Sequence, residues 1–156
     1  MRQRFLLYMA SALLTLPLMA AGVNNPSANF KVSQPTMVPG ATLQPGSYSI
    51  HVLDHLQDRF IMRIDQAGSA SHETFIGVPA AYLKSASTGS GAASWEAAPE
   101  GKAAMRGFTF GAGGTAIEFG YPKDDAVALA KLNGTKVLAI DPASEGKPAQ
   151  VSSLSK

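Results

Sequence analysis

The chain has 156 residues, no cysteine and a formal net charge of +2 at pH 7. This length is enough for one domain with one hydrophobic core, and the lack of cysteine excludes disulfides, thiol catalysis, Cys-ligated zinc and iron–sulfur clusters. Arg2 and Arg4 supply the whole positive excess, because removing them leaves 13 − 2 = 11 basic residues against 11 acidic ones; no basic patch is predicted, and nucleic acid is not expected as a partner.

The first 22 residues have the pattern of a cleavable export signal. Arg2 and Arg4 precede an apolar run over 5–19 that is too short to span a bilayer comfortably, and Pro17 interrupts it. Small residues near Ala21 and Gly22 offer a cleavage site, and no cysteine follows that could carry a lipid anchor. We therefore expect an exported protein, periplasmic or extracellular, with no stable membrane anchor after cleavage.

The next segment, 23–42, is polar and contains proline, and we predict a flexible leader there. The β-domain is expected over 43–140. Two runs with period-two alternation, 47–53 and 59–65, predict an antiparallel hairpin with a loop at 54–58. Folding them about Leu56 pairs Tyr48 with Ile64, Ile50 with Met62 and Val52 with Phe60, so that all the apolar partners share one face.

A third strand is predicted over 73–83, followed by a flexible Ser/Gly/Ala-rich loop at 84–93 and a short strand at 94–96. The runs 105–110 and 117–121 predict a second hairpin. Its expected register pairs Phe110 with Ile117 and Phe108 with Phe119. Arg106 then falls on the same face as these aromatic residues.

The pattern changes to helical near 122–133. Pro122 suits the first helical position, an apolar stripe follows at Ala126, Leu129, Ala130 and Leu132, and Gly134 predicts the end. A last strand is expected at 136–140 and a disordered tail at 141–156. Together these elements predict a mainly β fold, a small antiparallel β-sandwich or partly open barrel of six to seven strands with one short C-terminal helix.

Three histidines are the candidate metal ligands. His51, His55 and His72 lie near Asp54 in the region of the first hairpin, and imidazole with carboxylate is a set that zinc and other divalent metals accept. Two histidines four apart share a face on a helix but not in a strand and its loop. The alternative is that these histidines are ordinary surface residues.

A second set could bind a ligand instead of a metal. Arg59 and Arg63 could hold a carboxylate or phosphate, although neighbouring acidic residues could neutralise them as surface ion pairs. Arg106 could stack on Trp95 or Tyr121 at the mouth of the core, where a cation over an aromatic wall suits a small anion. The alternative for Arg106 is an arginine that extends from a strand end into solvent.

No motif specifies a catalytic chemistry. There is no Gly-x-Ser-x-Gly turn, and 111–114 joins two predicted strands and opens no helix, which argues against a phosphate-binding loop. We predict no catalytic residues and no cofactor, and lean toward a protein that is not an enzyme.

Several short motifs resemble those of small, uncharacterised exported bacterial proteins that have no assigned activity. Those proteins share a signal peptide, a Leu-x-x-Gly-x-Tyr first strand and a Phe-x-Tyr-Pro-Lys helix entry. The corresponding residues here are Leu43, Gly46 and Tyr48, then Trp95, Pro99-Glu100-Gly101 and Met105-Arg106, and finally Phe119, Tyr121, Pro122 and Lys123. The resemblance implies export and a small β-domain.

Three functions follow as competing hypotheses. The first is a non-enzymatic exported β-domain that binds a protein or polymer partner in the cell envelope through exposed strand edges or aromatic residues. The second is a small metal-dependent or acid–base enzyme that uses His51, Asp54, His55 and His72. The third is a structural envelope component that assembles with itself.

Overall fold

The structure, a computed structural model, describes residues 25–83, 89–111, 114–140 and 148–151. The predicted signal peptide, 1–22, lies outside the described residues, as do 84–88 of the predicted loop and most of the predicted tail. The strands are β1 (Ser27–Val32), β2 (Thr36–Val38), β3 (Ala41–Leu43), β4 (Gly46–His55), β5 (Phe60–Gln66), β6 (His72–Pro79), β7 (Gly91–Ser94), β8 (Ala103–Thr109), β9 (Ala116–Phe119), β10 (Tyr121–Pro122), β11 (Val137–Ile140) and β12 (Pro148–Val151). The helix α1 (Lys123–Asn133) and two 3₁₀ turns, η1 (Ala81–Leu83) and η2 (Pro99–Gly101), complete the described elements.

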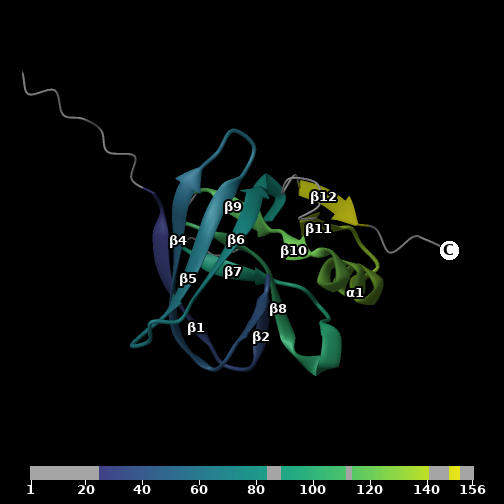
Figure 1. The fold of residues 1–156 in the computed structure, drawn as a ribbon, viewed down its shortest axis with the longest axis horizontal. Coiled ribbons are helices and arrows are strands. Elements are labelled where there is room, and N and C mark those ends of the chain that lie inside the picture. Colours follow the sequence, from purple (N-terminus) through teal and green to yellow (C-terminus); the bar gives the residue numbers. More distant parts are fainter. Residues whose placement is uncertain (1–24, 84–88, 112–113, 141–147, 152–156) are drawn as a thin grey trace, which may run out of the picture.

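One large mixed sheet dominates the fold (Figure 1). Its strands follow the order β1-β4-β5-β6-β9-β8-β2-β3, with β7 paired to β8, and β2 runs parallel to β8. The end strands β1 and β3 do not pair with each other, so the described sheet stays open. A second sheet, β10-β11-β12, lies beside α1 at the other end of the molecule. The predicted mainly β class with one C-terminal helix is confirmed.

The segment 23–42 is not a flexible leader throughout, because it contributes three strands. β1 pairs with β4 from Ser27 opposite His51 to Val32 opposite Gly46. Phe30 in β1 packs on Tyr48 and on Phe108, with 5.7 Å between ring centroids in each case. Alternating apolar residues make β1 a half-buried strand despite its polar composition. Together with β12 in the predicted tail, these strands raise the number above the six to seven expected.

Both hairpin registers differ from the prediction by two residues. Ile50 pairs with Ile64 and Val52 with Met62, and a β-bulge between Val52 and Asp54 carries β4 on to His55 opposite Phe60. In the second hairpin Phe108 pairs with Ile117. A shift of two residues by itself keeps side chains on their predicted face, so the apolar pattern fits both registers equally; Met105 and Arg106 change face for a separate reason, a bulge in β8. Turn geometry and bulges select between them, and these do not show in the apolar pattern.

The helix α1 and the strand β11 that follows it agree closely with the prediction. α1 ends at Gly134 in the left-handed conformation (φ 61°), which glycine adopts without strain. Ala126, Leu129 and Ala130 are buried as expected, but Leu132 is half exposed. Asn133 faces inward in its place: its side-chain amide donates to the carbonyl of Ala97 and accepts from the Ala97 N–H. A polar clamp therefore fixes the end of α1 to the segment before η2.

Tyr121 joins strands that lie far apart in the sequence. Its side chain is fully buried, and its hydroxyl lies 2.5 Å from the carbonyl oxygen of Met105 in β8 and 3.1 Å from that of Met37 in β2. Burial, and to a smaller extent the carboxylate of Asp125, raises the pKa of Tyr121, so the hydroxyl keeps its proton and serves as a donor. Tyr121 is a structural residue, which corrects its assignment as a ligand-binding residue.

Replacing Tyr121 by Phe should lower the free energy of unfolding by about 1–3 kcal/mol, because two buried carbonyls lose their shared donor. Urea denaturation of the purified protein measures the change. Tyr48→Phe is the matched control: the Tyr48 hydroxyl donates to the carbonyl of the exposed Gln44, which water can reach after the substitution. Equal losses in the two variants would contradict the role given to Tyr121.

Candidate functional site

Each of the three candidate metal ligands has a different contact. His51 in β4 faces Asp65, His55 at the end of β4 stacks on Phe60 with 4.5 Å between ring centroids, and the His72 ring lies 3.3 Å from the carbonyl of Ala70. Among the described residues, which include all three histidines, no three His, Asp or Glu side chains converge in an arrangement that could hold a metal ion. The hypothesis of a shared histidine site therefore lacks the convergence that it requires.

His51 does contact both a serine and an aspartate, but not in a catalytic arrangement. Its Nε2 lies 3.0 Å from Oγ of Ser49 and 3.5 Å from Oδ2 of Asp65. In a nucleophile–base–acid relay the hydroxyl and the carboxylate use opposite nitrogens of the imidazole. Here both contact one nitrogen, so the group serves as a polar surface network on the outer face of the sheet.

The two arginines of the first hairpin are held by neighbouring carboxylates. Arg63 pairs with Asp65 at 2.5 Å, and Nε of Arg59 donates to Asp58 at 2.9 Å. Each pair is at least partly exposed, and such pairs contribute about 0–1 kcal/mol. The ion-pair alternative therefore accounts for Arg59 and Arg63 without a ligand.

Arg106 lies on the opposite face of β8 from the one predicted. The pairing of β7 with β8 shifts between Ala93 and Ser94. Gly107 and Met105 each lie opposite a residue of β7, whereas Arg106 between them lies opposite none. A β-bulge of this kind reverses the alternation of side chains along the strand. Met105 and Phe108 can then both enter the core, while Arg106 turns toward Glu118 on the outer face of β9.

Four side chains gather around this bulge, and we call them the Tyr82 cluster. Nε of Arg106 donates to Oε1 of Glu118 at 3.1 Å, and the Tyr82 hydroxyl donates to the other carboxylate oxygen. The guanidinium carbon lies 4.5 Å from the ring centroid of Trp95 and 5.4 Å from that of Tyr82, both within the range of cation–π attraction. The cluster consists of Tyr82, Trp95, Arg106 and Glu118. Of the two stacking partners that the sequence offered for Arg106, Trp95 and Tyr121, the structure places the guanidinium over Trp95.

The exposure of the four side chains falls from the outside inward. Tyr82 is 62% exposed, the Arg106 side chain 30% and the Glu118 side chain only 3%. A carboxylate buried this deeply is stable only when it is paired and hydrogen-bonded, and Arg106 and Tyr82 meet both needs. The indole N–H of Trp95 is buried and has no hydrogen-bond partner among the described residues. The cluster thus presents the exposed Tyr82 ring and the guanidinium of Arg106. The buried carboxylate of Glu118 holds both side chains in place and balances the charge of Arg106.

Burial raises the pKa of Tyr82 to about 12, and the hydrogen bond to Glu118 and the charge of Glu118 add to the effect. Arg106 acts in the opposite direction because its positive charge favours the phenolate. Tyr82 therefore remains a neutral hydrogen-bond donor at physiological pH.

Glu118 escaped the sequence-based selection of site residues, and the sequence offered Tyr82 only as a possible member of an exposed aromatic patch. Glu118 interrupts the apolar run of β9 between Ile117 and Phe119, and a charged residue inside such a run is a signal of a buried ion pair. Tyr82 follows the end of β6 in η1, where a large exposed aromatic ring is unusual. The spacing between residues 82 and 118 cannot show that the two side chains meet.

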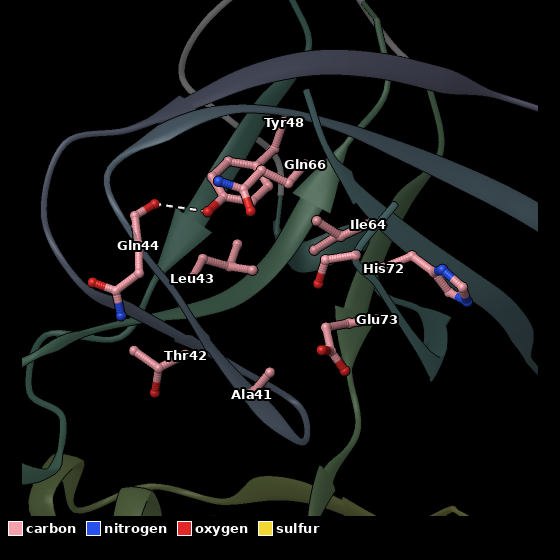
Figure 2. Close-up of a pocket in the computed structure, with 10 residues that line it drawn as sticks. Ala41, Thr42, Leu43, Gln44, Tyr48, Ile64, Gln66, His72 and Glu73 are labelled. Carbon is pink, nitrogen blue, oxygen red and sulfur yellow. Dashed lines mark hydrogen bonds between the residues drawn. The ribbon is translucent and has the colours of Figure 1, made fainter. Parts of the chain in front are cut away.

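A separate small pocket lies between β3 and the start of β6 (Figure 2). Its volume is about 100 Å³, and its floor consists of the buried side chains of Leu43, Tyr48 and Ile64. The rim is polar and includes Gln44, Gln66 and Glu73, whereas the His72 ring points away from the others in the close-up. This pocket shares no residue with the Tyr82 cluster.

Comparisons of the chain with protein-family models, with curated proteins and with solved structures find no match. No helix in the part of the chain that the structure describes is long and apolar enough to cross a membrane.

The raised pKa of Tyr82 predicts a specific loss of stability at high pH. The unfolded chain deprotonates this phenol near pH 10, whereas the folded protein holds the proton to about pH 12. The stabilisation of the folded protein by the protonated Tyr82 is therefore fully present below about pH 10 and is lost as the pH rises from 10 to 12. Urea midpoints measured across this range should fall more steeply for the native protein than for Tyr82→Phe, and parallel curves would contradict the assignment. Glu118→Gln should move the phenol titration, followed by ultraviolet absorbance, toward pH 10.

Proposed function

We propose that the protein is an exported, non-enzymatic β-domain that binds a protein or polymer partner in the cell envelope, and that the Tyr82 cluster is part of the contact surface. The observation that carries this proposal is the exposed Tyr82 ring, fixed through its hydroxyl to the buried Glu118 beside the guanidinium of Arg106. The export component comes from the N-terminal sequence pattern.

Three properties of the cluster support binding. Tyr, Trp and Arg are the residue types that most often dominate the energy of protein interfaces. The hydroxyl of Tyr82 and the Nε of Arg106 are anchored to Glu118, so little side-chain entropy remains to be lost when a partner binds. Glu118 also neutralises Arg106, which favours a partner with apolar and hydrogen-bonding groups over a simple anion.

No specific observation favours the enzyme hypothesis. It depends on His51, His55 and His72 acting together, and among the described residues no three His, Asp or Glu side chains form a group that could hold a metal ion. Self-assembly, the third hypothesis, would use the same exposed surfaces, and the size of the protein in solution distinguishes it from binding of a different partner.

Native mass spectrometry of the protein purified from its own exporting cell tests whether the signal peptide is removed and whether the protein carries a metal ion. We expect a chain that lacks about the first 22 residues, and a mass that a chelator does not change. A retained N-terminus would contradict export. A stoichiometric metal lost on chelation would contradict the non-enzymatic proposal and support the histidine hypothesis, and concentration-dependent oligomers would support self-assembly.

Replacement of Tyr82 by Ala should weaken retention of the exported protein on isolated envelope fractions by about tenfold or more, as expected for a central aromatic contact. Sedimentation with separated protein and polymer fractions measures the retention and identifies the class of partner. Leu132→Ala is the matched control, because Leu132 is a half-exposed apolar residue on α1, away from the cluster. Equal retention of the two variants would overturn the role of Tyr82.

A further inference from the structure

The pocket between β3 and β6 combines an apolar floor with a carboxylate at its rim. Leu43, Tyr48 and Ile64 form the floor and are at most 6% exposed. A volume of about 100 Å³ is smaller than the ~150 Å³ of an engineered cavity that binds benzene. The apolar floor therefore suits a small aliphatic group better than an aromatic ring.

Glu73 is the charged residue of interest in this pocket. It lies opposite Ile64 and two residues before Phe75, so strand alternation places it on the inner, apolar face of β6. Among the described residues its carboxylate makes no ion pair or side-chain hydrogen bond, and no Lys or Arg lines the pocket. A half-buried carboxylate of this kind is complementary to a cation that enters from outside.

The backbone around the pocket is also unpaired on one side. β6 pairs with β9 only over Gly77–Pro79, so the first half of β6 has no described strand partner on that side. β3 pairs only with β2 and ends the sheet. Free N–H and C=O groups at such edges can pair with an extended peptide.

We propose that this pocket binds the amino-terminal residue of an extended polypeptide. The small aliphatic side chain of that residue fills the apolar floor, and its α-ammonium group pairs with Glu73. The side-chain amides of Gln44 and Gln66 at the rim, together with the free edge of β3, are available to the peptide groups that follow.

This site stands apart from the Tyr82 cluster and does not depend on the proposed function. A partner protein with a free N-terminus could use both surfaces, but each can fail by itself. Tyr82→Ala should therefore leave peptide binding at the pocket unchanged.

Titration of the ¹⁵N-labelled exported protein with the peptide Val-Gly-Gly-amide tests the proposal by NMR. We expect saturable shifts at residues 41–44 and 71–73. Acetylation of the peptide amine, Glu73→Gln, and replacement of the first Val by Trp should each weaken binding by about tenfold or more. Glu96→Gln, which removes an exposed carboxylate elsewhere, is the matched control and should have no effect.

Two results would overturn the proposal. One is the absence of saturable shifts at the pocket with any of the peptides. The other is equal affinity for the free and the acetylated peptide, which would show that the ammonium–carboxylate pair contributes nothing. Because Glu73 is not in the core cluster, Glu73→Gln should keep the native circular dichroism spectrum and urea midpoint.

Discussion

A single β-bulge in β8 determines how the two faces of the large sheet are used. Without it, alternation would place Arg106 beside Phe108 and Phe110 in the core, where an unpaired guanidinium is costly. With it, Met105 and Phe108 are both buried, and Arg106 reaches Glu118 on the outer face. The bulge thus allows Met105 to enter the core and, at the same position, directs Arg106 to the Tyr82 cluster.

The buried Glu118 limits what can surround it. Its carboxylate is almost wholly removed from water, so loss of either Arg106 or Tyr82 would leave a buried charge with a missing partner. The neighbouring Gly107 fits closely against β9, since a Cβ at this position would lie 2.3 Å from the carbonyl oxygen of Ile117. Strands of the main sheet therefore position Arg106 and Glu118, whereas Tyr82 comes from η1 and Trp95 directly follows β7.

The two surfaces have different physical characters. The Tyr82 cluster presents one projecting aromatic ring, that of Tyr82, beside the ion pair of Arg106 with Glu118 on strands β8 and β9. The pocket at Glu73 is a recess with one uncompensated charge, and it exists because β3 and β6 lie close together without pairing. A projecting surface suits a broad partner, whereas a recess of this size selects the end of a chain.

The sequence by itself determined the mainly β class, the helix over 123–133, its end at Gly134 and the inner faces of both hairpins apart from Met105 and Arg106. These features depend on local periodicity and on backbone preferences of single residues, which can be seen within a few positions. The sequence also offered Trp95, as an alternative to Tyr121, as a stacking partner of Arg106. Only the tertiary structure decided the hairpin registers, the strand β1 within the predicted leader, the burial of Tyr121 and the meeting of Tyr82 with Glu118. Each of these depends on a bulge or on contacts between distant segments, and an alternation of period two is the same before and after a shift of two residues.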